Sequence, residues 1–212
     1  MWWFKPRSPS CPLWLNFQEA AMANEVWDQI ANYRKTKVLP GGARLLLRPL
    51  RKEDKEAFVD LFARASREDL EWYRIDAADP AVVASWVDNL DYRRVFPLVA
   101  FVNDQLIGNA TLHFGEHYHR HLAWVRIFLD RNYRRQGIGT LMVQSLIEIA
   151  RRLGLYQLYG EIVTTQPQVI SAFLDLGFQH ATTLRDYFIT STGETLDMAI
   201  LVLYLVEQTG KF

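Results

Sequence analysis

The stretch Leu129-Asp-Arg-Asn-Tyr-Arg-Arg-Gln-Gly-Ile-Gly-Thr140 lies between an apolar, strand-like run over His121–Leu129 and an amphipathic, helix-like run over Thr140–Leu153. Its two glycines, Gly137 and Gly139, let the backbone approach a ligand closely and turn its N–H groups toward that ligand. The first turn of the following helix adds unpaired N–H donors and a partial positive charge. Together these features predict a loop that binds a phosphate group.

Three known loop patterns compete for this stretch. A P-loop requires Gly-Lys followed by Ser or Thr, which the stretch lacks. The dinucleotide fingerprint G-x-G-x-x-G requires a third glycine where the chain has Met142, and it opens the first βα unit of a parallel sheet, whereas this loop comes late. The third pattern, R-x-x-G-x-G, is satisfied by Arg134, Gly137 and Gly139.

This third pattern resembles the cofactor loop of the GNAT superfamily of acyl-CoA N-acyltransferases, which often reads apolar-Asp-Pro-x-Tyr-Arg-x-x-Gly-Ile-Gly. Only the proline is missing, and Arg131 replaces it. Further along the chain, Gln166-Pro-Gln-Val-Ile-Ser-Ala-Phe-Leu-Asp-Leu-Gly-Phe178 resembles the family's Asn-x-x-Ala-x-x-Leu-Tyr-x-x-Leu-Gly-Phe segment, a helix beside the pantetheine arm. The resemblance extends over residues 43–205 and implies acetyl-CoA as the acyl donor.

The resemblance also implies which residues bind the donor. The glycine loop would hold the pyrophosphate, and the strand before it would pair with the pantetheine like an added strand, at a bulge that splays it from its neighbour. The expected cofactor-binding residues are Ile127, Leu129, Arg134, Arg135, Gln136, Gly137, Ile138, Gly139, Thr140, Gln166 and Phe173.

The implied reaction is transfer of the acetyl group to a primary amine of a small molecule or a protein, by direct attack in a ternary complex. Many family members have tyrosine where this chain has Phe173, and a phenyl ring cannot donate a proton. The remaining catalytic candidates are His121 or Glu161 as the base, and Tyr187 or a water as the acid. Phe173 also keeps open a non-catalytic acyl-CoA-binding or sensing module, and a nucleotide-binding protein of another class is a third alternative.

Hydrophobic periodicity predicts a single α/β domain with a mixed, mostly antiparallel central sheet flanked by helices. We expect this domain to span residues 38–212, and residues 1–37 to form an extension that is disordered or partly helical. The expected strands are 43–50, 96–102, 105–114, 121–129, 156–163, 178–190 and 196–205. The expected helices begin near residues 25, 54, 66, 79, 140 and 166, and the first of them would end near Lys35.

The first 23 residues have three interpretations. Lys5 and Arg7 precede an apolar stretch and Ala21-Met-Ala23, which superficially resembles a secretory signal, although Pro12 interrupts its centre. A disordered leader and an upstream extension before a start at Met22 are the alternatives.

Composition limits the partners. Lys plus Arg and Asp plus Glu are 24 each, so the zero net charge does not favour nucleic acid or an acidic membrane surface. The single cysteine, Cys11, offers no disulfide or metal cluster, and no metal site is expected. We therefore expect a cytoplasmic protein that binds acetyl-CoA and an amine acceptor, with monomer and homodimer both open. Four aromatic residues of the variable helical region, mostly core, are candidates to line an acceptor pocket: Trp72, Tyr73, Trp86 and Tyr92.

Overall fold

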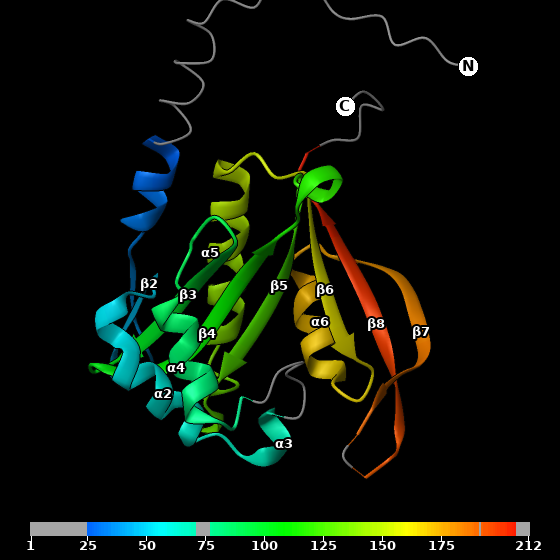
Figure 1. Cartoon of the computed structure of the whole chain (residues 1–212), viewed down its shortest axis with the longest axis horizontal. Coiled ribbons are helices and arrows are strands. Elements are labelled where there is room, and N and C mark those ends of the chain that lie inside the picture. Colours follow the sequence, from blue (N-terminus) through cyan, green and yellow to red (C-terminus); the bar gives the residue numbers. More distant parts are fainter. Residues whose placement is uncertain (1–24, 71–76, 191, 207–212) are drawn as a thin grey trace, which may run out of the picture.

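The computed structural model describes residues 25–70, 77–190 and 192–206 (Figure 1). Eight strands form one sheet in the order β1-β2-β3-β4-β5-β6-β8-β7, and each neighbouring pair is antiparallel except β5 and β6, which are parallel. This confirms the predicted mixed, mostly antiparallel sheet. The strands are β1 Lys35–Val38, β2 Arg44–Pro49, β3 Val95–Val102, β4 Gln105–Phe114, β5 Leu122–Leu129, β6 Gln157–Val163, β7 Gln179–Ile189 and β8 Thr195–Tyr204.

Helices cover both faces of the sheet. The helical elements are residues 25–31, α2 Lys55–Ala63, α3 Arg67–Leu70, α4 Pro80–Asp88, α5 Ile138–Arg152 and α6 Pro167–Asp175, with short 3-10 turns η1 Lys52–Asp54, η2 His117–His119 and η3 Arg131–Tyr133. The core cluster of α2 and α4 contains Val99, Leu106 and Phe128, whereas α5 and α6 pack on a cluster that contains Ala123 and Leu158. Because strand side chains alternate between faces, α2 and α4 lie on one face, and α5 and α6 on the other.

Local side chains and backbone conformations explain several of the element boundaries. The Asn103-Asp104 turn between β3 and β4 has φ values of 48° and 64°, the positive pair that a two-residue hairpin requires. Asp79 accepts a hydrogen bond from the Ala81 N–H at the start of α4. Asp54 occupies the N-cap position of α2 but its carboxylate bonds backward, to the Arg48 guanidinium and the Arg51 N–H, because Arg48 on β2 lies within reach.

The start of the described chain differs from the prediction. The first helix ends at residue 31, and Lys35 belongs to β1, a four-residue strand that the sequence pattern did not predict. Ile30 and Tyr33 are buried in the same core cluster as α5, so these two side chains contribute to the core. The boundary between residues 37 and 38 stays a prediction. Within the described residues, no helix is both long and apolar enough to cross a bilayer.

The parallel pair β5 and β6 is short. It contains four residue pairs, from Leu122 opposite Gln157 to Val125 opposite Gly160, and the strands then separate toward their carboxyl ends (Figure 1). The β4–β5 register stays regular from Ala123 to Leu129, so the expected bulge in β5 is absent from this ladder. The divergence arises because β5 continues to pair with β4 while β6 continues to pair with β8, and the twist of each ladder draws the two strands apart.

Phe173 of α6 packs where the two strands begin to separate. Its ring is 3% exposed and lies 4.8 Å from the Phe178 ring, centroid to centroid. A Cβ atom on Gly160, in the last residue pair, would be 3.0 and 3.1 Å from two ring carbons of Phe173. Glycine at this position therefore lets the ring lie directly on the β6 backbone.

This contact predicts the effect of Gly160→Ala. An alanine in a strand normally lowers unfolded-state entropy and stabilises the fold, but here its methyl group meets the Phe173 ring. We expect a loss of about 1–3 kcal/mol in the free energy of unfolding, measured by chemical denaturation. The loss should shrink in a Phe173→Leu background, and a stabilising Gly160→Ala would contradict the packing described.

Candidate functional site

The predicted phosphate loop connects β5 to α5 through η3. Asp130 begins η3 by accepting a hydrogen bond from the Asn132 N–H at 3.0 Å, and its own N–H donates to the Ile107 carbonyl of β4 at 2.9 Å. Arg135 has a φ of 61° and Gly137 a φ of 74°, so two residues adopt the left-handed backbone conformation just before α5. This backbone course leaves residues 134–137 exposed at the helix N-terminus.

The backbone N–H groups of residues 135–140 have no acceptor in the described part of the chain. Gly137 is the N-cap of α5, and it has no side chain that could satisfy them. The first backbone bond of this helix runs from the Leu141 N–H to the Gly137 carbonyl at 3.1 Å. A row of unpaired N–H groups at the positive end of a 15-residue helix attracts an anion.

The free edge of β5 leads into this loop. The His121 carbonyl accepts from the Tyr156 N–H at the start of β6, whereas the Asp130 N–H points to β4. Because backbone groups alternate along a strand, the odd residues of β5 direct their N–H and C=O groups toward β6. Beyond Val125 no described strand pairs with that side, so Ile127 and Leu129 present an open backbone edge.

Arg134 extends its side chain back to this edge. Its Nε donates to the Leu129 carbonyl at 2.9 Å, and its Nη2 lies 2.9 Å from Asp69 Oδ1 of α3. Arg131 binds the same segment, with Nε 2.7 Å from Asp69 Oδ2 and Nη2 2.9 Å from Glu68 Oε2. Two arginines of the predicted cofactor loop therefore hold α3 through one shared carboxylate.

The Asp69 carboxylate is ionised in this arrangement. Burial, which leaves its side chain 10% exposed, would by itself raise its pKa. Hydrogen bonds from Arg134, Ser66 and Arg131 outweigh burial and hold the pKa of Asp69 below its ordinary value. The Asp69 carboxylate thus already binds Arg134, the arginine that the sequence predicts to bind a phosphate.

Sequence reasoning missed Asp69 and the role of Arg131. The replacement of the family's proline by Arg131 was visible, and so was Ser66-x-x-Asp69, the spacing at which a serine and a carboxylate bond each other. Neither pattern indicates that two segments 62 residues apart meet. Their ion pairs follow from the topology, which places the end of β5 beside α3.

The other predicted cofactor residues surround the same region. Gln136 donates from its side chain to the Asn132 carbonyl at 3.1 Å, and Ile138 is buried in the main core cluster. Gly139 lies against Ile127, since a Cβ there would be 3.5 Å from the Ile127 Cδ1. Gln166 precedes Pro167 as the N-cap of α6 without bonding the helix through its side chain.

The catalytic candidates are distributed unequally around the open edge. Glu161 is the first residue of β6 beyond the last β5–β6 pair, and it shares a face with Tyr159 and Trp124, whose rings are 6.0 Å apart. His121 instead precedes β5, at the paired end of the strands, where its ring lies 6.2 Å from Tyr156. The face of Glu161 is also that of α2 and α4, opposite α5 and α6.

Tyr187 lies farther away, in β7. It is 50% exposed and falls in the register shift between Leu184 and Phe188. Asp197 of β8 connects this region to the end of β6. Its carboxylate accepts a hydrogen bond from the Asp186 N–H, and its carbonyl accepts one from the Thr164 N–H. Tyr187 is thus level with the carboxyl end of β6, and strand β8 lies between the two.

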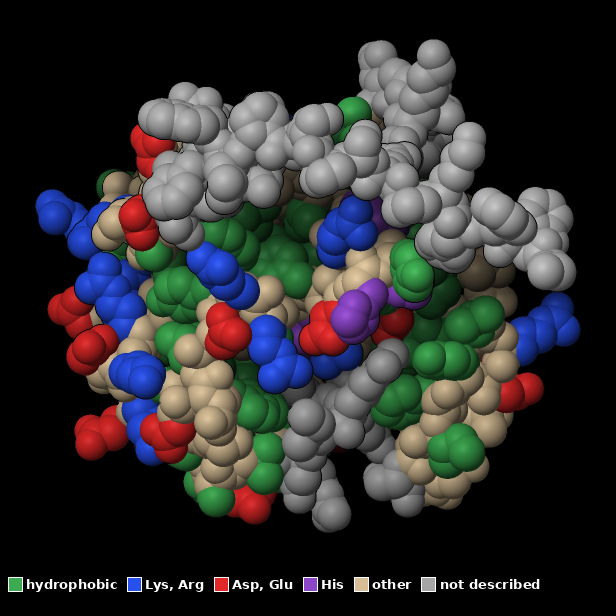
Figure 2. Space-filling view, turned by 45° about the horizontal axis from the view of Figure 1, so that its top comes forward, with side chains coloured by type: hydrophobic (Ala, Val, Ile, Leu, Met, Phe, Trp, Pro, Cys, Tyr) green, Lys and Arg blue, Asp and Glu red, His purple; other side chains and the backbone are tan. Residues whose placement is uncertain are grey.

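Two further histidines, His117 and His119, lie in η2, close to His121 in the sequence. His117 and His119 are exposed, and Figure 2, which brings this end of the sheet forward, shows histidine side chains among acidic and basic ones. Within the described residues, no three His, Cys, Asp or Glu side chains are arranged to hold a metal ion. Trp86 packs edge-on against Phe62, and the Tyr92 hydroxyl donates to the Leu50 carbonyl; Trp72 and Tyr73 lie outside the described residues.

Comparison with known proteins bears on this arrangement of loop, strand and helix. The model of the Acetyltransferase (GNAT) family matches residues 48–178, more than half of the chain. The chain belongs to this family. The matched region includes β5, the glycine loop, α5 and Phe173.

Curated relatives are similar over shorter regions. A [ribosomal protein bS18]-alanine N-acetyltransferase of Escherichia coli is 32% identical over 77 residues, which cover 36% of this chain and 51% of that protein. An acetyltransferase of Pseudomonas aeruginosa is 27% identical over 127 residues, covering 58% and 68% respectively. The chain thus spans about half the length of the first of these relatives.

Solved structures share the fold. An acetyltransferase of the GNAT family from Streptococcus pneumoniae superposes with a TM-score of 0.67 at 19% identity, covering 76% of this chain and 99% of that one. A Salmonella typhimurium protein solved with its cofactor acetyl-CoA gives a TM-score of 0.66 at 19% identity, covering 78% and 96%.

The Asp69 contacts predict a change in cofactor affinity. If Arg134 binds a phosphate of acetyl-CoA, as the sequence predicts, that phosphate competes with Asp69 for the guanidinium. Asp69→Asn should then bind acetyl-CoA about three- to tenfold more tightly by isothermal titration calorimetry, roughly 1 kcal/mol. Glu68→Gln is the matched control, because Glu68 contacts Arg131 but not Arg134, and it should leave the affinity unchanged. Asp69→Asn should also have no effect in an Arg134→Ala background. Weaker binding by Asp69→Asn would show that Asp69 supports the cofactor site instead.

Proposed function

We propose that the protein is an N-acetyltransferase that transfers an acetyl group from acetyl-CoA to a primary amine by direct attack in a ternary complex. One observation carries this proposal: the unpaired N–H groups of residues 135–140 directly continue the open backbone edge of Ile127 and Leu129. An anion site and a strand edge in this order suit a ligand with a pyrophosphate at one end and amides along its arm. Family membership supports the same ligand.

The residues of the glycine loop and of the open β5 edge fit acetyl-CoA. The loop N–H groups and Arg134 would hold the pyrophosphate, while Ile127 and Leu129 would bond the pantetheine amides. The Leu129 carbonyl can accept from a pantetheine amide only after its hydrogen bond with Arg134 Nε breaks. That bond would break if the Arg134 side chain turned toward the phosphate. Acetyl-CoA, when bound, supplies an activated acetyl thioester.

Glu161 is the base that we propose. An amine attacks only when neutral, so a group near the acceptor must take its proton. Glu161 stands just where β5 and β6 part, on the face away from α5, whereas His121 lies at the closed end of the same pair. For the acid we retain Tyr187 or water, because Phe173 has no proton to give.

The acceptor is a primary amine of a small molecule or a protein. The E. coli relative, which acts on an alanine of a ribosomal protein, supports including protein N-termini among the acceptors tested. We propose a cytoplasmic location, as for an enzyme that uses acetyl-CoA.

A non-catalytic acyl-CoA-binding module is the second candidate. Phe173 favours it, because a buried phenyl ring stands where the family resemblance implies a tyrosine. A turnover assay that detects released thiol separates the two functions. Acetyl-CoA binding with thiol release on a panel of small amines and N-terminal peptides would support the enzyme, and binding without release on the whole panel would favour the module.

Glu161→Gln tests the assignment of the base. Glutamine keeps the size of the side chain but does not take up a proton, so we expect kcat to fall by about 10²- to 10⁴-fold with little change in acetyl-CoA affinity. Glu194→Gln, in the exposed β7–β8 turn, is the control and should retain full activity. An unchanged kcat in Glu161→Gln would assign the proton transfer to another group.

A further inference from the structure

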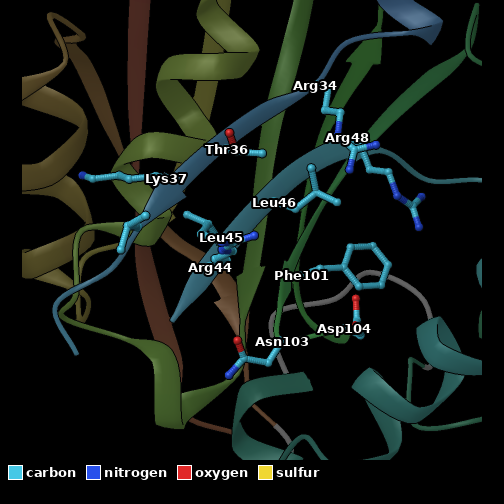
Figure 3. Close-up of a pocket in the computed structure, with 11 residues that line it drawn as sticks. Arg34, Thr36, Lys37, Arg44, Leu45, Leu46, Arg48, Phe101, Asn103 and Asp104 are labelled. Atoms are coloured by element: carbon cyan, nitrogen blue, oxygen red, sulfur yellow. The ribbon is translucent and has the colours of Figure 1, made fainter. Parts of the chain in front are cut away.

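A hollow of about 740 Å³ lies at the opposite edge of the sheet from β7, on β1, β2 and β3 (Figure 3). Its floor is a row of side chains from neighbouring strands, in which Thr36 pairs with Leu46 and Leu46 with Phe101. Leu46 and Phe101 are half-buried, and Phe101 packs on the core cluster of α2 and α4. The hollow is therefore on the same face as these helices but beyond their cover.

Positive charge surrounds this apolar floor. Four basic side chains and one acidic side chain line the hollow. Arg48 is neutralised by Asp54, with both bonds at 2.6 Å, and its guanidinium lies 4.4 Å from the Phe101 ring centroid. Arg34 and Arg44 are exposed and have no carboxylate partner within the described residues.

Lys35 pairs with Leu47, so Arg34 lies across from Arg48 just before β1. Because Asp54 neutralises Arg48, Arg34 and Arg44 are the positive charges that a bound anion would meet on this face. Basic residues on an edge strand also oppose unwanted strand pairing, but that role does not need an apolar floor beside them.

Strand β1 is the edge of the described sheet, and its outer side is open to pairing. The Leu39 N–H donates to the Ala43 carbonyl at 2.8 Å, so the odd residues of β1 bond β2. The backbone groups of Thr36 and Val38 therefore point outward. Their side chains, including Val38 at 65% exposure, lie on the face of the hollow.

We propose that this surface docks an acidic peptide segment, added as a strand along β1. Val38 pairs with Arg44, so Arg34 and Arg44 are four residues apart along the strands, or about 13 Å. A strand with acidic residues at i and i+4 matches this span, and its residue i+2 would lie beside Thr36, whose partner in β2 is Leu46. The favoured sequence is acidic-x-apolar-x-acidic. This docking is independent of the proposed acetyl transfer.

Fluorescence anisotropy with the full chain and a labelled peptide containing Glu-Thr-Leu-Thr-Glu tests the proposal. Arg44→Glu should weaken peptide binding at least tenfold. Arg185→Glu on β7 carries the same charge change away from the hollow and should bind like the parent protein. Equal affinities of the two variants, or no binding of the peptide to the parent protein, would overturn the proposal.

Two further arms test the strand pairing and the class of ligand. Thr36→Pro removes an outward N–H without removing a β1–β2 bond, and it should weaken binding. A peptide N-methylated at alternate residues tests the same bond if that variant does not fold, and unchanged binding would rule out pairing. A single-stranded oligonucleotide that displaces the peptide at lower concentration would assign the surface to nucleic acid instead. Acetyl-CoA affinity should be the same in Arg44→Glu and the parent protein, whatever the outcome for acetyl transfer.

Discussion

The separation of β5 from β6 is the constraint on which the rest of the candidate site depends. Each strand stays hydrogen-bonded to its outer neighbour, β4 or β8, and their own pairing ends at Val125 and Gly160. The Phe173 ring packs on Gly160 at that point. The separation exposes the backbone of Ile127 and Leu129, directs it into the N-terminus of α5, and leaves Glu161 at the opening.

The sequence predicted the fold and the glycine turn into α5 well because both depend on short-range patterns. Alternation identified the strands other than β1, and Arg134, Gly137 and Gly139 identified the turn into α5. Strand β1 was missed because Lys35–Val38 is short and exposed, with one apolar residue. The ion pairs of Asp69 with Arg131 and Arg134 were also missed, since contacts between distant segments leave no periodic signal. The choice of Glu161 over His121 as the proposed base follows from strand register, which sequence spacing alone does not provide.

Arg134 links two segments that are distant in the sequence, α3 and the carboxyl end of β5. Through Asp69 it holds α3, and through Leu129 it occupies the backbone edge proposed for the pantetheine. Arg131 bonds the same carboxylate and also Glu68, so α3 keeps an anchor when Arg134 turns away. Arg131, which stands where the family resemblance implies a proline, thus has a structural role in this chain, because it anchors α3.

The sheet can also be viewed as two blocks. Strands β1 to β5 form one antiparallel block and β6, β8 and β7 another, and four residue pairs join them. Deforming a junction this short disturbs few hydrogen bonds, so a change in the angle between the two blocks costs little. A molecule that bonded both β5 and the elements beside β6 would hold the two blocks at a fixed angle. Amide hydrogen exchange would then slow on both sides of the junction together, in strands that such a molecule never touches.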